Sequence, residues 1–200
     1  QVSRVSLAPA DVDAIVFWSK NPAPLMRHLP ELDRMPLRYC FLCTVNDYPV
    51  HLEPHVPPLA ARLETFRNLS AMIGKGKVVW RYDPVIMSGL LDCDYHRRAF
   101  SGIARVLRGH TDRVIVSVLD CYARTERRIV LIEARTGDSI VRDPFSLHGF
   151  DSLVRDLAAI AADNGMHIQS CAEDDRLAGF GIPPGKCIDD GLLRDVLGVS

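Results

Sequence analysis

Five short apolar runs organise this chain, and each of them ends abruptly in charged or polar residues. The runs lack the alternation of apolar and polar positions that marks a strand with one solvated face. We therefore expect strands that are buried on both faces, as in a parallel sheet covered by helices. The runs occupy residues 14–18, 39–43, 78–80, 114–119 and 167–168.

Segments with helical spacing lie between these runs. In residues 59–73 the apolar side chains recur every three or four positions, and Gly74 follows as a helix stop. Asp94 can cap the next helix, which runs towards Gly109. Two further helices are expected, over about residues 151–162 and from Asp189 or Asp190 onwards.

The alternation of strands and helices predicts a parallel α/β sheet with right-handed crossovers. A complete eight-stranded barrel needs about 250 residues, so this chain of 200 residues predicts a partial, TIM-barrel-like parallel β/α barrel. Residues 1–200 are expected to form a single domain, truncated at both ends, because Gln1–Leu7 already reads as a strand in progress. Residues 122–147 are the least regular, and residues 129–132 fit either an extra strand or the end of a helix.

Composition narrows the classes of protein. Twenty-four basic residues stand against twenty-five acidic ones, without a basic stripe, so nucleic-acid binding is not indicated. No apolar stretch reaches the roughly 18 residues of a membrane helix, and the amino terminus does not resemble a signal peptide. A cytoplasmic protein is expected, and its six irregularly spaced cysteines are expected to be reduced thiols.

Three local motifs favour structural roles over chemical ones. Cys40 and Cys43 have the spacing of a redox or metal pair, but residues three apart in a strand point to opposite faces, which favours buried small hydrophobes. His51–His55 offers metal donors, yet its prolines prevent a helical two-histidine site, and a solvated loop is favoured. Residues 179–187 resemble a phosphate loop without its full glycine pattern and with Cys187 in place of serine or threonine.

The sharper signals are charged residues that directly follow the apolar runs. In a barrel the carboxyl ends of the strands meet at one rim, where ligands bind. These residues are therefore consistent with a ligand-binding site, and they are equally consistent with structural ion pairs that close the mouth of the barrel. They are Lys20, Arg81, Asp83, Asp120, Glu173 and Asp174, and Asn46 is expected at the same rim.

Several stretches resemble a bacterial family labelled a domain of unknown function, whose carboxyl-terminal cysteine cluster is similar to that of radical S-adenosylmethionine enzymes. The resemblance extends over nearly the whole chain, and the stretches follow the order found in the family. The matching stretches are Val12–Pro22, Trp80–Pro84, Cys171–Glu173 and Gly185–Asp189.

The resemblance implies an α/β barrel, an iron–sulfur cluster and S-adenosylmethionine, with chemistry begun by one-electron cleavage of that cofactor. It also implies an electron donor protein as a partner. Such a cluster needs three closely spaced thiolates, which the six cysteines of this chain do not offer, and in the family the cluster follows after the position of Ser200. The candidate cofactor-binding residues are Asn21, Cys171, Lys186 and Cys187.

We interpret the chain as the barrel core of a radical S-adenosylmethionine-like enzyme of unknown small-molecule substrate. Two alternatives stay open: a divalent-metal hydrolase or isomerase, and a non-enzymatic barrel that serves as a binding module. The candidate catalytic residues are Lys20, Arg81, Asp83, Asp120 and Glu173, and the metal ligands of the alternative enzyme would be His51, His55, Asp83, Asp120 and Glu173.

Overall fold

The structure, a computed structural model, describes residues 6–8, 11–35, 37–171, 175–186 and 188–199. Within them, five parallel strands form one sheet in the order in which they occur along the chain. The expected strand over Gln1–Leu7 falls mostly on residues 1–5, which lie outside the described part. The strands are β1 (Ile15–Ser19), β2 (Tyr39–Thr44), β3 (Val78–Val85), β4 (Arg113–Val118) and β5 (His167–Ser170).

Seven α-helices and three short 3₁₀ turns accompany the strands in the described residues, and of these α7 and η3 follow the last strand. The helices are α1 (Ala23–Met26), α2 (Leu29–Arg34), α3 (Leu59–Ile73), α4 (Cys93–Leu107), α5 (Ala123–Thr136), α6 (Phe150–Asp163) and α7 (Asp190–Leu197). The 3₁₀ turns are η1 (Lys75–Lys77), η2 (Pro144–Ser146) and η3 (Asp175–Phe180). No helix in this part of the chain is both long and apolar enough to cross a membrane.

The expected helices form where the apolar spacing placed them, with one correction at a cap. Helix α3 ends at Gly74, whose φ of 92° lies in the left-handed region that favours glycine. Helix α4 is capped by Asp92 and not by Asp94, because the Asp92 carboxylate accepts the Tyr95 amide at 2.7 Å. Asp189 caps α7 in the same way through the Leu192 amide.

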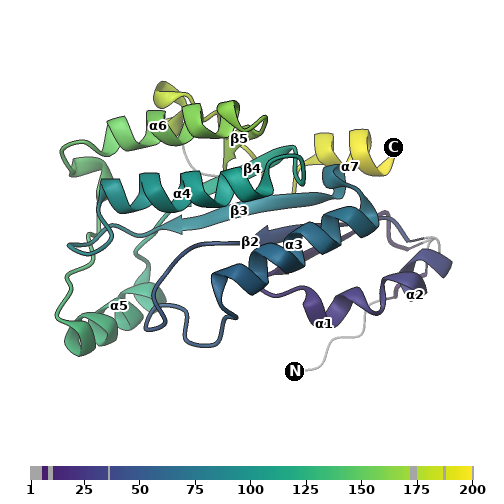
Figure 1. The fold of residues 1–200 in the computed structure, drawn as a ribbon, viewed down its shortest axis with the longest axis horizontal. Coiled ribbons are helices and arrows are strands. Elements are labelled where there is room, and N and C mark those ends of the chain that lie inside the picture. Colours follow the sequence, from purple (N-terminus) through teal and green to yellow (C-terminus); the bar gives the residue numbers. More distant parts are fainter. Residues whose placement is uncertain (1–5, 9–10, 36, 172–174, 187, 200) are drawn as a thin grey trace.

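The sequential strand order places the main connecting helices on one face of the sheet. Right-handed crossovers that always step in the same direction leave their helices on the same side. Figure 1 shows α3, α4 and α6 side by side on this face, with α1 and α2 next to α3. The core packs between sheet and helices around fully buried rings such as Phe41, Trp80 and Phe100.

The other face of the sheet carries a smaller apolar cluster, covered by α7. Side chains alternate along β2, so that Cys40 and Leu42 face α7 while Phe41 and Cys43 face the helix layer. The same alternation along β3 sends Val79 towards α7 and Trp80 into the core.

A closed barrel is not formed by the described residues. The prediction of a parallel α/β sheet is confirmed, but the sheet is open, and β1 and β5 are its two edges. The strand order is nevertheless that of a sheet wound in a single direction, as in a barrel, and not the reversing order of a doubly wound fold. All five strands therefore present their carboxyl ends to one rim.

Residues 122–147, which the sequence left open, form α5 and the turn η2. Neither an extra strand nor the end of a helix lies at residues 129–132, because these residues are in the middle of α5. This helix does not join the layer of α3, α4 and α6 but lies beyond the carboxyl ends of the strands (Figure 1). Its buried residue is Ile129, which explains why no apolar face was readable.

The glycine-rich loop at residues 179–186 is explained by close packing. A Cβ atom at Gly185 would lie 2.4 Å from the carbonyl oxygen of Ser170 and 2.6 Å from the Gln169 side chain. In the same loop, the Pro183 carbonyl accepts a hydrogen bond from the Ser170 amide at 2.9 Å. Glycine thus lets this loop lie directly against the end of β5, which is a structural role.

Candidate functional site

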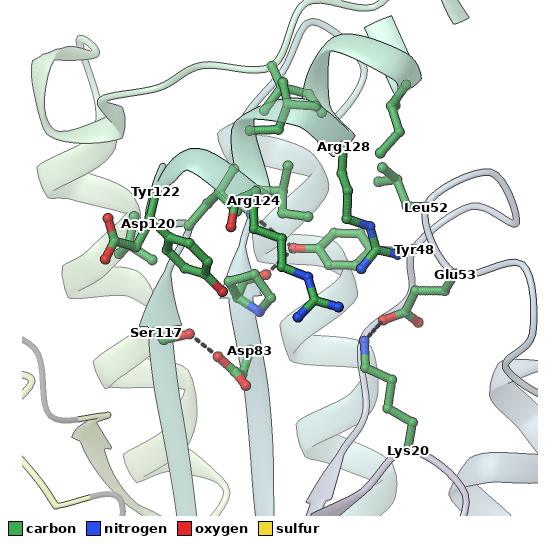
Figure 2. Close-up of a pocket in the computed structure, with 18 residues that line it drawn as sticks. Lys20, Tyr48, Leu52, Glu53, Asp83, Ser117, Asp120, Tyr122, Arg124 and Arg128 are labelled. Carbon is green, nitrogen blue, oxygen red and sulfur yellow. Dashed lines mark hydrogen bonds and ion pairs between the residues drawn. The ribbon is translucent and has the colours of Figure 1, made fainter. Parts of the chain in front are cut away.

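A cavity of about 550 Å³ lies at the carboxyl rim of the sheet, between the strand ends and α5. Its volume is in the range of small-molecule sites. Figure 2 shows polar side chains from several strand ends, from the loop after β2 and from α5 around this cavity. The charged lining residues are Lys20, Glu53, Asp83, Asp120, Arg124 and Arg128, and the polar and aromatic ones include Tyr48, Ser117, Tyr122 and Thr125.

Asp83 is a carboxylate of this cavity that is held from two sides. The ladder between β3 and β4 is irregular between Tyr82 and Val85, so that Asp83 lies at an interruption in the pairing. Its carboxylate accepts a hydrogen bond from the Ser117 hydroxyl on β4 and forms an ion pair with Arg81 at 2.9 Å. A group fixed from two sides in this way can orient a ligand without losing much conformational freedom itself.

The loop after β2 holds the end of β3 in place. The buried amide of Asn46 donates to the Asp83 carbonyl at 2.9 Å and accepts the Asp83 amide at 3.1 Å. Two residues later, the Tyr48 hydroxyl donates to the Pro84 carbonyl at 2.6 Å and accepts the Ile86 amide at 3.0 Å. Burial raises the pKa of Tyr48 well above its usual value, so it remains a neutral donor.

Glu53 forms the opposite wall of the cavity. The sequence favoured a solvated loop for residues 51–55, which is wrong for Glu53, because its carboxylate is buried between two cations. Lys20, which follows β1, pairs with one carboxylate oxygen, and Arg62 on α3 lies 3.5 Å from the other. Burial lowers the pKa of Arg62, and the negative charge of Glu53 opposes that change.

The predicted rim residues in the described part do lie at one end of the sheet. Lys20, Asp83 and Asp120 line the cavity, and Asn46 and Arg81 hold Asp83 from behind. Figure 2 shows Asp120 directed away from Asp83. Asp120 also lines a second, polar hollow of about 570 Å³. Glu173, Asp174 and Cys187 lie outside the described residues.

Arg81 connects Asp83 to two further side chains at the rim. Its guanidinium donates to the Cys171 sulfur at 3.2 Å and lies 5.4 Å from the ring centre of Trp18. Trp18 is 54% exposed at the edge strand, an unusual position for so large an aromatic side chain. Cys171, a candidate cofactor-binding residue that follows β5, thus lies at the rim beside the Arg81 guanidinium.

Two of the predicted cofactor-binding residues lie elsewhere. Asn21 is exposed, and its side chain accepts the Ala23 amide at the start of α1, a turn that explains its residue type. Lys186 is exposed and pairs with Asp190 at the start of α7, and it does not line the cavity.

The cysteines of the described part do not gather into a metal or cluster site. Cys40 and Cys43 are buried on opposite faces of β2, and burial raises their pKa values to about 11 and about 12. No three histidine, cysteine, aspartate or glutamate side chains lie close enough to hold a metal ion in the described ranges. An iron–sulfur cluster therefore does not fit the described cysteines. The described members of the ligand set proposed for a metal enzyme, His51, His55, Asp83 and Asp120, do not form such a group, and Glu173 lies outside the described residues.

Sequence reasoning missed the side of the cavity formed by α5. Tyr122, Arg124 and Arg128 come from the segment whose structure was unreadable, and Ser117 was hidden inside an apolar run. Tyr48 lay in a loop without a motif. Only the (i, i+4) spacing of Arg124 and Arg128 was visible, and it gains meaning once the helix is known.

Behind the cavity, His96 is held as a neutral imidazole. It is fully buried on α4, where its Nε2 donates to the Ile86 carbonyl at 2.9 Å and its Nδ1 accepts the Tyr82 hydroxyl at 2.8 Å. Burial lowers the pKa of His96 below its usual value. The hydrogen bond to Ile86 helps to fix the segment that follows Asp83 and Pro84.

We expect this histidine to make the fold sensitive to mild acid. Below about pH 6.5 the unfolded chain binds a proton that the folded chain refuses, so the free energy of unfolding falls by up to about 1.4 kcal/mol per pH unit. The contribution of neutral His96 to stability is fully present above about pH 6.5, and it is lost as the pH falls towards the pKa of His96 in the folded protein. Urea unfolding at pH 7, 6 and 5 measures it. In His96→Gln this decrease in the free energy of unfolding should disappear between pH 7 and pH 5. In the control His55→Gln, at an exposed histidine, the decrease should persist. An unchanged decrease in His96→Gln would mean that other groups cause it.

Comparison with known proteins yields a match to one family. Neither the curated proteins nor the solved structures contain a match to this chain. The family match extends from residue 1 to residue 200 and so includes β1 to β5, the cavity and α7. Its description gives no activity. With the whole sequence matched, the chain belongs to the family described as Domain of unknown function (DUF1848).

Proposed function

We propose that this chain is the ligand-binding core of a radical S-adenosylmethionine-like enzyme, and that the cavity at the carboxyl rim receives the polar groups of cofactor or substrate. One observation carries the proposal. Acidic and basic side chains from the ends of β1, β3 and β4 surround a cavity of about 550 Å³ at the rim where parallel α/β folds bind ligands.

The donor set suits a ligand with an amine or hydroxyl group. Asp83 is aligned by Ser117 and Arg81, and its exposed edge can accept a hydrogen bond from such a group. Glu53 and Lys20 offer a second acceptor and a donor across the cavity. The amino-acid portion of S-adenosylmethionine carries an amine and a carboxylate, so it fits this pattern.

The described residues form the cavity, but the iron–sulfur cluster is implied only by the resemblance to radical enzymes. Since the described cysteines do not fit a cluster, its thiolates would come from outside the described residues, and the resemblance to radical enzymes implies a separate cysteine cluster and an electron donor protein that serves it. When bound, S-adenosylmethionine supplies one-electron chemistry to the site. The residues described here would bind and orient the reactants and shield them from water.

The test is binding of S-adenosylmethionine, measured by isothermal titration calorimetry under anaerobic conditions. We expect saturable binding to the native protein with its iron–sulfur cluster and none to residues 1–200 without the cluster. Binding to Asp83→Asn should be weaker by about tenfold or more, because one charge-assisted hydrogen bond contributes about 1.5–3 kcal/mol. The matched control is Asp163→Asn, at the exposed end of α6, which should bind normally.

Two results would count against the proposal. If the native protein does not bind S-adenosylmethionine, the assignment to radical chemistry is wrong for this cavity. If Asp163→Asn loses as much affinity as Asp83→Asn, the loss reflects general charge and not the site. Stoichiometric zinc or manganese in the purified protein would instead favour the divalent-metal enzyme.

A further inference from the structure

Helix α5 is placed like a cover and not like a crossover helix. It lies beyond the carboxyl rim, while the neighbouring crossover helix α6 packs against α4 in the helix layer (Figure 1). Its attachment is mainly polar. Arg142 pairs with Glu126 and Glu133 on α5, which lowers the pKa of Glu133 to about 2, and the Ile140 amide donates to Glu133 at 2.8 Å.

Two arginines of this helix point into the cavity. Arg124 and Arg128 are one turn apart, so they share a face, and Figure 2 shows both guanidinium groups directed towards the space between Asp83, Tyr48 and Glu53. Two other cations at the rim already form ion pairs with carboxylates: Lys20 pairs with Glu53, and Arg81 pairs with Asp83.

Arg124 and Arg128 differ from those cations. Among the described residues neither forms an ion pair, and the acidic side chains of α5 that could neutralise them, Glu126 and Glu133, are engaged by Arg142. Like charges four residues apart destabilise a helix by about 0.2–0.5 kcal/mol. A pair of this kind facing a cavity is stabilised when an anion lies between the two guanidinium groups.

We propose that Arg124 and Arg128 clamp an anionic group of the substrate, a phosphate or a carboxylate, and that α5 thereby determines the substrate class. Guanidinium groups match both anions through paired N–H donors. The proposal rests on the proposed function, because it places the substrate in the same cavity. The anionic end would lie under α5 and a hydroxyl or amino end at Asp83 and Ser117.

The experiment uses inorganic phosphate and succinate as probes, titrated into the protein by calorimetry at low ionic strength. The native protein should bind at least one probe, and the tighter one identifies the anion. Arg124→Gln/Arg128→Gln should weaken that binding by about tenfold or more. The control Arg127→Gln/Arg135→Gln removes the same charge from the same helix at positions that do not line the cavity, and it should bind like the native protein.

The outcomes separate this inference from the proposed function. It is overturned if the native protein binds neither anion, or if the control variant loses as much affinity as Arg124→Gln/Arg128→Gln. Anion binding that needs Arg124 and Arg128, in a protein that does not bind S-adenosylmethionine, supports the clamp and rejects only the radical chemistry. The reverse result rejects only the clamp.

Discussion

Replacing Glu53 by alanine is expected to lower the free energy of unfolding by about 3–5 kcal/mol, because it leaves a buried charge without its partner. The side chains of Glu53 and Arg62 are only 7% and 5% exposed, and among the described residues the Arg62 guanidinium would keep its hydrogen bond to the Pro57 carbonyl. Urea unfolding at pH 7 measures the loss. Lys20 would also be released, which changes the wall of the cavity.

A second substitution distinguishes an unpaired charge from a general loss of packing. In Glu53→Ala/Arg62→Met both charges are absent, and much of the lost stability should return, since a buried ion pair is often replaceable by apolar groups. The control is Glu31→Ala, which removes an exposed partner of His28 and should change stability by less than about 0.5 kcal/mol. A double variant no more stable than Glu53→Ala contradicts this account.

Truncation of Trp80 to alanine is expected to cost about 3–5 kcal/mol, since it removes a large, fully buried ring. The ring centre of Trp80 lies 4.6 Å from that of Phe100 and 6.0 Å from that of Tyr82, and its Nε1 donates to the Val45 carbonyl at 2.9 Å. That bond holds the end of β2 just before Asn46, so the variant should also loosen the cavity. Urea unfolding followed by circular dichroism gives the magnitude.

The second tryptophan of the chain is the matched control for this prediction. Trp18 is 54% exposed, so Trp18→Ala removes little buried area and should have a much smaller effect on stability. Trp80→Phe keeps most of the ring and loses the hydrogen bond to Val45, so an intermediate loss is expected. Equal losses in Trp18→Ala and Trp80→Ala would show that burial does not decide the cost.

The strands could be predicted because burial on both faces leaves a direct trace in the sequence. Four of the apolar runs match strands within two residues at each end, but the third continues from Trp80 to Val85. Arg81 and Asp83 are therefore inside β3 and not after it. Their side chains alternate with Trp80 and Tyr82, which point into the core, so a polar face interrupted the apolar pattern.

The site was only half predictable, for a physical reason. Lys20, Arg81, Asp83 and Asp120 could be identified because each follows closely after a readable apolar run. Helix α5 buries so little apolar surface that apolar periodicity does not reveal it. Its two arginines reach the cavity because the helix lies beyond the carboxyl ends of the strands, a position that the local sequence does not encode. The pairing of Glu53 with Arg62 likewise depends on tertiary contacts, as does the neutral state of His96.

The position of α5 also bears on how this family could diversify. Because the helix packs outside the layer of α3, α4 and α6, substitutions on its inner face change the cavity without disturbing the core that stabilises the sheet. Selection can therefore act on ligand preference through a few codons of one helix, while the sheet stays under separate constraint. Related chains with the same strands and different residues at positions 124 and 128 would then be expected to handle different molecules.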